Sequence, residues 1–325
     1  MSTPSAQAEH HHPPPLAHLH GAVPPAPAWF TQALAQAPQR RQVLVQGAAI
    51  ESLVWGRAGD PGILLLHGNS AHADWYSFIA PLLASQGRRV VALSFSGMGA
   101  SDWRASYGVG QWADEAHAVA AEAGLFDGGA KPVVAGHSFG GFPLIAMAAR
   151  YGQQLARAII VDTPLRPPEG MQEREAKRRA RAEAGPVAAK VYHSVAEALA
   201  RFRFLPPQGC EHLFIADHIA RCSLKAVTDE QGRPGYSWRF DPNLFRGFDF
   251  GHPRRDLGAA QCAVALVRGG ASRLITPELL EMAQGLAPAG TPTYEVPGAD
   301  HHVMVDQPLV FAQLLAQWAD EAWAN

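Results

Sequence analysis

Short apolar runs alternate with longer amphipathic stretches along most of this chain, from about residue 29 onward. Each run is bounded by turn-forming residues, as buried strands of a parallel sheet are, and the stretches between the runs have helical periodicity. This alternation predicts βαβ units, in which helices cover both faces of a mostly parallel sheet. The expected strands are Ile63–Leu66, Arg89–Leu93, Pro132–Ala135, Ala158–Val161, Ala263–Val267 and Thr293–Val296, preceded by an antiparallel hairpin at Gln42–Gln46 and Ser52–Trp55. The expected helices are Trp75–Gln86, Gln111–Ala123, Gly140–Tyr151, Pro277–Ala287 and Pro308–Ala324.

Two parts of the chain lack this alternation. Residues 163–255 separate two predicted strands and contain the charged run 169–183, which has Glu and Lys/Arg at helical spacings and predicts a solvated helix. A connection this long within one domain predicts a structured insertion, which we interpret as a helical lid. Residues 1–28 are rich in Pro, His and Ala, a composition that predicts a disordered tail. The expected core therefore comprises residues 29–162 and 256–325.

Charge and cysteine content argue against several classes of function. A formal net charge of −2 over 325 residues supplies none of the excess Lys/Arg that nucleic acids or anionic membranes require, so a small-molecule partner is expected. Three cysteines without a CxxC spacing predict neither a disulfide framework nor a zinc site. The sequence shows no secretory signal and no apolar run long enough to span a bilayer. We therefore expect a soluble cytoplasmic protein, a monomer or a homodimer, without a bound metal.

A Gly-x-Ser-x-Gly pattern surrounds Ser138, between a predicted strand and a predicted helix. Glycines on both sides permit the strained turn that lifts a serine hydroxyl above the edge of the sheet, the arrangement called a nucleophile elbow. The backbone N–H of Phe139 would then lie at a helix N-terminus, where it can stabilise an oxyanion. Ser138 is therefore the predicted nucleophile.

A second pattern, the pair His67-Gly68, follows another buried strand. Together with the loop at 94–102, these patterns resemble the α/β-hydrolase superfamily, in particular its lid-bearing branch that cleaves esters, lactones and carbon–carbon bonds. The resemblance covers about residues 29–325. It implies the α/β-hydrolase fold, a mostly parallel central sheet flanked by helices, with a helical lid insertion. It also implies a second oxyanion donor at the amide of Asn69, whereas His67 is interpreted as stabilising the turn.

The segment 297–308 resembles the histidine loop of this family. In that loop the histidine precedes an acidic residue by five positions and a proline by seven, and His301 has both offsets, to Asp306 and Pro308. A serine hydroxyl needs a neutral imidazole to take its proton, so His301 is the predicted base. His302 is the competing candidate.

The predicted mechanism also needs an acid that holds the imidazole in the correct tautomer. Many members of the family carry it as an aspartate in the loop after the strand that corresponds to Ala263–Val267, where this chain has Arg273. A cation cannot stabilise an imidazolium. Asp162 follows the strand expected beside the nucleophile strand, and it is the predicted acid. The alternatives are Glu278, Asp249, Asp256 and a missing acid.

The predicted activity is hydrolysis of a carboxylic ester or lactone through an acyl-enzyme, with no cofactor. A small, largely apolar substrate is expected because the insertion supplies aromatic residues, Phe202 and Trp238 among them. Arg201 or Arg203 would bind a substrate carboxylate, unless both face solvent or pair within the lid. The alternatives are a carbon–carbon bond hydrolase of the aromatic-degradation type, an acyltransferase or lyase on the same fold, and a non-catalytic binding protein. The remaining residues of the predicted apolar wall are Phe204, Leu205 and Phe214.

Overall fold

An eight-stranded sheet forms the centre of the molecule in a computed structural model, which describes residues 12–167, 169, 173, 176, 180, 183 and 185–324. The strand order is β1-β2-β4-β3-β5-β6-β9-β10. β1 and β2 form the predicted antiparallel hairpin, β2 is antiparallel to β4, and the remaining neighbours are parallel. The strands are β1 (Gln39–Val45), β2 (Ala48–Trp55), β3 (Gly62–Leu66), β4 (Arg89–Leu93), β5 (Val133–His137), β6 (Arg157–Val161), β9 (Ala263–Gly269) and β10 (Thr293–Val296).

The register of the parallel strands brings several loops to one edge of the sheet. His137 at the end of β5 lies opposite Val161 at the end of β6, and Val161 lies opposite Val267 in β9. Leu66 at the end of β3 lies opposite Gly136. The residues that follow these strands therefore meet at their carboxyl ends, where ligands bind in open α/β sheets.

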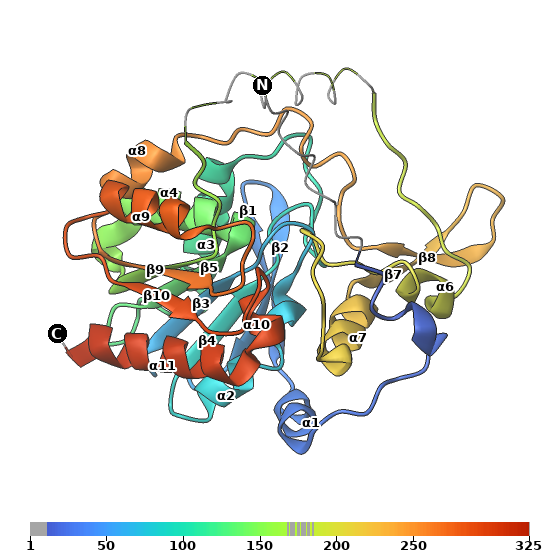
Figure 1. Cartoon of the computed structure of the whole chain (residues 1–325), viewed down its shortest axis with the longest axis horizontal. Helices are drawn as coiled ribbons and strands as arrows, with labels where there is room; N and C mark the ends of the chain where they lie inside the picture. Colours follow the sequence, from blue (N-terminus) through green and yellow to red (C-terminus); the bar gives the residue numbers. More distant parts are fainter. Residues whose placement is uncertain are drawn as a thin grey trace, which may run out of the picture.

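Helices cover both faces of the sheet (Figure 1). α3 (Val109–Glu122), α4 (Gly141–Tyr151), α8 (Pro253–Gly258) and α9 (Pro277–Leu286) pack on one face, and α2 (Ala80–Ala84) and α11 (Pro308–Ala324) on the other. The helix predicted at Trp75–Gln86 is divided into η2 (Ala73–Tyr76) and α2 because Pro81 has no N–H to continue the preceding turn. Among the described residues, no helix combines the length and the apolar character needed to cross a bilayer.

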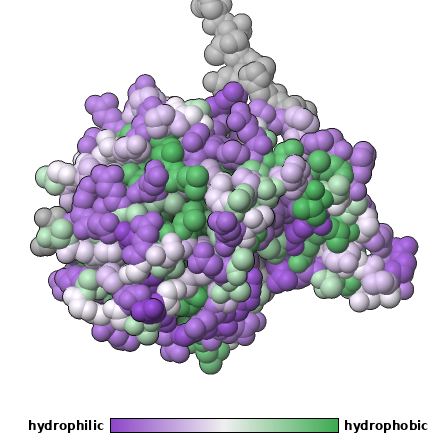
Figure 2. All heavy atoms as spheres, turned by 90° about the horizontal axis from the view of Figure 1, so that it is seen from below, coloured by the Kyte–Doolittle hydropathy of each residue, from purple (hydrophilic) through white to green (hydrophobic). Residues whose placement is uncertain are grey.

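The insertion between β6 and β9 lies to one side of the sheet, at the right of Figure 1. It contains α6 (Val195–Leu199) and α7 (Leu213–Cys222), but also an antiparallel hairpin of β7 (Leu224–Thr228) and β8 (Pro234–Trp238). The prediction of a wholly helical insertion is therefore wrong. The hairpin forms where Asp229 closes a turn by accepting the backbone N–H groups of Gln231 and Arg233. The charged run 169–183 lies largely outside the described residues. In Figure 2 the insertion projects from the larger body, and apolar side chains are exposed on both.

The N-terminal segment is ordered over more residues than its composition predicts. Leu16 is 1% exposed and belongs to the core, and η1 (Ala17–Leu19) and α1 (Ala28–Ala35) follow it. Arg221 of α7 donates a hydrogen bond to the carbonyl oxygen of Gly21 at 2.8 Å. Residues 16–28 are therefore not a disordered tail, because contacts with a distant segment stabilise them. Residues 1–11 of the predicted tail lie outside the described residues.

Candidate active site

Ser138 directly follows β5 and is the first residue of η3 (Ser138–Gly140), which continues into α4. Its φ is 53°, a left-handed conformation that costs a non-glycine residue about 1–2 kcal/mol. A Cβ on Gly140 would lie 2.4 Å from the carbonyl oxygen of His67, and one on Gly136 would lie 2.6 Å from that of Gly140. Both glycines are therefore required by close backbone approach, as expected of a strand–turn–helix elbow.

His301 lies in the loop between β10 and α10 (Val303–Asp306). The Ser138 hydroxyl donates to His301 Nε2 over 2.8 Å. His302, the competing candidate, has no hydrogen-bond partner on either ring nitrogen. His137 Nε2–H donates to the carbonyl oxygen of His301 at 2.8 Å, so the residue before Ser138 also fixes the backbone of the predicted base. No sequence pattern pointed to this role of His137.

Asp162 follows β6 directly and is fully buried. Its Oδ2 accepts hydrogen bonds from His301 Nδ1 at 2.6 Å and from the Ser272 hydroxyl at 2.8 Å. Its Oδ1 accepts the backbone N–H of Gly269 at 2.9 Å. Three donors thus compensate the cost of burying an ionised carboxylate. The structure connects Ser138, His301 and Asp162 in that order.

The alternative acids lie elsewhere. Glu278 is exposed, Asp249 accepts the backbone N–H of Gly251, and Asp256 pairs with Arg255. Within the described part of the chain, none of the three is bonded to His301. Arg273 is exposed, and its loop contributes to the site through the neighbouring Ser272, a residue that the sequence reasoning did not single out.

The loop after β3 passes close to Ser138. A Cβ on Gly68 would lie 3.2 Å from the Ser138 Cβ, so the peptide that joins Gly68 to Asn69 is next to the predicted nucleophile. His67 Nδ1–H donates to the Gly68 carbonyl oxygen at 2.7 Å, and Nε2 accepts the backbone N–H of Phe95 at 3.0 Å. Burial lowers the pKa of His67 to about 3. His67 is therefore neutral and stabilises the turn, which is the role expected for it.

Phe139 follows Ser138 at the start of the helical segment. Its ring makes edge contacts with Trp112 at 5.6 Å and with Phe248 at 5.4 Å between centroids. Such aromatic pairs are individually weak, but together they hold a partly buried side chain in one orientation. The backbone amide of Phe139 is thereby fixed beside Ser138.

A cleft of about 240 Å³ lies beside the Asn69 loop and the histidine loop; its described lining includes His302 but not Ser138 or His301. Asn69 lines it, as do four residues predicted to contact the substrate, namely Arg201, Phe202, Arg203 and Trp238. Leu205 of the predicted apolar wall also lines the cleft, whereas Phe204 packs against Trp75, and Phe214 packs against Phe30 of α1. His302, considered in the sequence only as a competing base, also lines the cleft. The sequence reasoning missed lining residues that come from separate segments: Ser70, His72, Trp75, Ser223, Arg239 and Phe240.

The charged groups of this cleft are all cationic. Arg201, Arg203 and Arg239 line it, and no Asp or Glu is among the described lining residues. Arg203 donates to the carbonyl oxygen of His12, and Arg239 Nε donates to that of Leu224. None of the three forms an ion pair with a described residue. Unpaired guanidinium groups of this kind bind carboxylates in a bidentate manner.

The histidine loop is anchored by a residue of the insertion. Gln208 Oε1 accepts the backbone N–H of His302 at 2.9 Å, and Gln208 Nε2 donates to both oxygens of Asp306 at 3.0 Å. Asp306 also accepts the backbone N–H of Asp300 at 2.8 Å. Burial raises the pKa of Asp306 to about 6. Asp306, which identified the loop in the sequence, therefore joins the two ends of that loop to the insertion.

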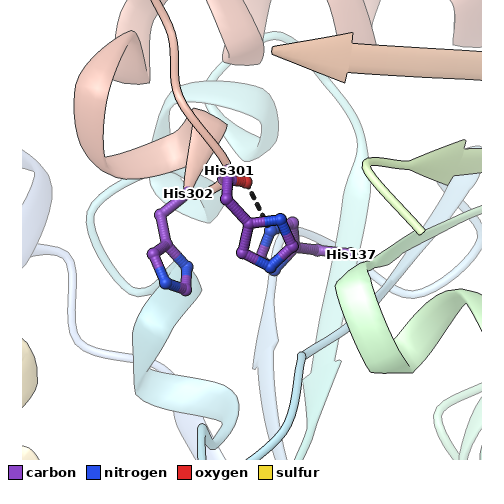
Figure 3. Close-up of side chains that lie close together, drawn as sticks. All are labelled: His137, His301 and His302. Carbon is purple, nitrogen blue, oxygen red and sulfur yellow. Dashed lines mark hydrogen bonds between the residues drawn. The ribbon is translucent and has the colours of Figure 1, made fainter. Parts of the chain in front are cut away.

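Three buried histidines form the one group in the described part of the chain that has the composition of a metal site. His137, His301 and His302 each offer a ring nitrogen, and these nitrogens all lie within 4.8 Å of one another (Figure 3). Burial, reinforced by the neighbouring His301, holds the pKa of both His137 and His302 well below its usual range. Both rings are therefore neutral.

Comparison with known proteins agrees with this architecture. No curated protein sequence matches the chain. Among solved structures, a thioesterase domain from the curacin biosynthetic pathway has a TM-score of 0.70 at 23% identity, covering 87% of this chain and 99% of that one. An esterase from Mycobacterium tuberculosis has a TM-score of 0.68 at 22% identity, covering 90% and 98%. The structure of E-2-(acetamidomethylene)succinate hydrolase has a TM-score of 0.67 at 18% identity, covering 87% and 99%. At these identities the likeness shows the fold alone.

The family model of the alpha/beta hydrolase family matches residues 63–314. This range contains the Ser138 elbow, Asp162 and the histidine loop, and it makes up more than half of the chain. The chain therefore belongs to the alpha/beta hydrolase family.

Proposed function

We propose that this hydrolase cleaves a carboxylic ester or lactone through an acyl-enzyme on Ser138. The observation that carries the proposal is the continuous hydrogen-bond chain from Ser138 through His301 to the buried carboxylate of Asp162. A neutral imidazole at 2.8 Å from a serine hydroxyl is within reach of its proton. A carboxylate on Nδ1 keeps the lone pair on Nε2, where the mechanism needs it.

In the proposed reaction, His301 takes the Ser138 proton as Oγ attacks the carbonyl carbon. The backbone N–H groups of Asn69 and Phe139 stabilise the oxyanion of the tetrahedral intermediate. His301 then gives its proton to the leaving alcohol, and the acyl group stays on Ser138. Water, deprotonated by His301, attacks this ester and releases the acid, which restores Ser138.

We further propose that the substrate combines an apolar body with a carboxylate. Phe202, Trp238 and the other aromatic residues of the cleft supply apolar contact area, and its cations lack carboxylate partners among the described residues. A carbon–carbon bond hydrolase acting on a carboxylated substrate would fit the same cations. Analysis of the products distinguishes the two activities, since only ester cleavage releases an alcohol.

Covalent labelling with a fluorophosphonate probe tests the nucleophile and base. We expect the wild type to be labelled, Ser138→Ala not to be labelled, and His301→Ala to be labelled at least 100-fold more slowly. Parallel assays with a short acyl ester should give the same order. An unlabelled but folded wild type without turnover would support a binding protein instead.

Two esters of the same alcohol test the carboxylate, one a hemisuccinate and the other a neutral butyrate. Replacing both Arg201 and Arg203 by Ala should lower kcat/KM for the hemisuccinate about 10-fold or more and change that for the butyrate less than twofold. Arg233→Ala is the matched control, because Arg233 is an exposed arginine of the insertion that pairs with Asp229. Equal losses on both esters would argue against carboxylate binding.

A further inference from the structure

His137, His301 and His302 come together near Ser138 from two separate parts of the chain. His137 ends β5, and the other two precede α10, yet their ring centroids lie 4.8 to 5.5 Å apart. All three residues are at most 4% exposed. In Figure 3 the His302 ring lies beside the His301 ring, and the His137 ring lies behind that of His301. Such a group of imidazoles exceeds what the proposed hydrolysis needs, since that reaction uses His301 alone.

The hydrogen bonds of two of these rings, His301 and His137, match those of metal-binding histidines. A metal-ligating histidine typically donates its other N–H to a carboxylate or a backbone carbonyl, which orients the ring and raises its basicity. His301 Nδ1–H donates to Asp162, leaving the Nε2 lone pair, and His137 Nε2–H donates to the His301 carbonyl, leaving the Nδ1 lone pair. The same point, the Cβ position of Gly68, lies 3.2 Å from His137 Nδ1 and 3.2 Å from the Ser138 Cβ. His137 Nδ1 and the Ser138 Cβ therefore flank the same point beside Gly68.

His302 supplies the independent observation. It is 4% exposed, and neither of its ring nitrogens has a hydrogen bond of normal geometry, although the nearby Leu205 backbone raises its pKa against the larger effect of burial. A buried polar group without a partner costs roughly 1–3 kcal/mol, so native structures rarely contain one without a reason. His302 lines the cleft, which gives a small ligand a route to it.

We propose that these three histidines form an inhibitory site for a transition-metal dication such as Zn²⁺. The metal binds the Nε2 lone pair of His301 and a ring nitrogen of His302, with His137 as the third ligand. Ser138 then keeps its proton, because the lone pair that would accept it is occupied. Imidazole ligands suit Zn²⁺, Ni²⁺ and Cu²⁺, whereas Mg²⁺ and Ca²⁺ prefer oxygen ligands.

The side chains must move before a metal can bind, because the Ser138 hydroxyl lies 2.8 Å from His301 Nε2. Zinc–nitrogen bonds of about 2.0–2.1 Å in a tetrahedral site place two nitrogens about 3.4 Å apart. One ring nitrogen of each histidine lies within 4.8 Å of the other two, so the nitrogens would have to come closer by up to about 1.4 Å. The buried carboxylate of Asp162, one imidazole away, supplies negative charge next to the metal, while Arg201 and Arg203 are exposed at the cleft.

Direct titration of the full-length chain with ZnCl₂ tests the site without relying on hydrolysis. Calorimetry on Ser138→Ala should show one site per chain, with no binding of MgCl₂ or CaCl₂. Adding His302→Phe should weaken that site at least 10-fold, because Phe keeps the ring contacts with Trp75 and Phe204 but has no nitrogen. His302→Cys should restore binding, which excludes misfolding as the cause of the loss.

The N-terminal histidines His10, His11 and His12 require a matched control. Replacing all three by Asn should leave the one-site binding unchanged. If the Asn variant loses Zn²⁺ binding while His302→Phe retains it, the metal binds the N-terminal segment and the proposal is overturned. The proposal is also overturned if Ser138→Ala binds no Zn²⁺.

Inhibition is the second readout, and this part of the inference rests on the proposed function. Zn²⁺ should inhibit ester hydrolysis reversibly, and EDTA should restore the activity. The Zn²⁺ concentration that halves the activity should be at least 10-fold higher for His302→Phe than for the wild type. The activity of each variant is expressed relative to its own activity without metal. Zn²⁺ binding at His302 without any inhibition would overturn the inhibitory role. If the wild type hydrolyses no ester, the proposed function fails, while calorimetry still decides whether the metal binds.

Discussion

Asp162→Asn tests the assignment of the acid, because the structure allows the new amide only one orientation. Asp162 Oδ1 accepts the backbone N–H of Gly269, a donor that cannot change its role. The amide oxygen of Asn must therefore face Gly269, and its NH₂ group must face His301 and the Ser272 hydroxyl. The hydroxyl can rotate to accept a hydrogen bond from the new NH₂ group.

The imidazole responds by changing its tautomer. With an NH₂ donor opposite Nδ1, His301 keeps its lone pair on Nδ1 and carries its proton on Nε2, which faces Ser138 at 2.8 Å. It then cannot accept the Ser138 proton. The wrong tautomer costs serine hydrolases about 10⁴-fold in kcat, equivalent to about 5 kcal/mol of transition-state stabilisation.

The assay measures kcat/KM on a short acyl ester together with the rate of fluorophosphonate labelling, and both should fall by a similar factor. Arg273→Ala is the control, since Arg273 occupies the position of the acid in many relatives but is exposed here. It should retain activity within about twofold. A folded Asp162→Asn variant with more than a tenth of wild-type activity would refute the reasoning, and so would an equal loss in Arg273→Ala.

Two further predictions concern stability. Gly140→Ala should lower the free energy of unfolding by about 3 kcal/mol in urea titrations, because the new Cβ would lie 2.4 Å from the His67 carbonyl oxygen. Gly110→Ala in α3 is the control, since the atom nearest to its new Cβ would be 3.5 Å away. This control should change the free energy of unfolding by less than about 1 kcal/mol. Burial raises the pKa of Asp306 from 3.8 to about 6, so folding favours its protonated form and this group lowers stability as the pH rises from about 4 to about 6. The shift corresponds to about 3 kcal/mol, which we reduce to about 2 kcal/mol because the side chain is partly exposed. About a third of this effect has already developed at pH 4.5, which is above the unfolded pKa. Relative to wild type, Asp306→Asn should therefore gain about 1.3 kcal/mol between pH 4.5 and pH 7.5 in denaturant titrations, and a pH-independent difference would contradict the cause.

The sheet and its helices follow from local sequence patterns. The predicted ranges Arg89–Leu93, Thr293–Val296 and Pro308–Ala324 coincide with β4, β10 and α11. Strands that are buried on both faces become continuous apolar runs, and long amphipathic helices keep a 3.6-residue period, so both are visible without tertiary information. The pairing of β5 with β6, expected from their order along the chain, places Asp162 beside the nucleophile turn.

The insertion and the N-terminal segment were less predictable because long-range contacts determine them. Leu16 lies in a proline-rich segment and is buried against residues far along the chain. The β7–β8 hairpin is short, and its burial pattern depends on the surface against which it packs. Composition and periodicity describe neither kind of contact.

Gln208 shows how such contacts also shape the candidate site. Its hydrogen bonds to His302 and Asp306 span 94 and 98 residues, so no motif could have indicated them. The insertion that carries Gln208 also supplies Arg201, Phe202 and Arg203 to the cleft. One short segment therefore both lines the cleft and holds the loop of the predicted base. A backbone shift in this segment would change the position of His301 together with the shape of the cleft, because Gln208 couples the two.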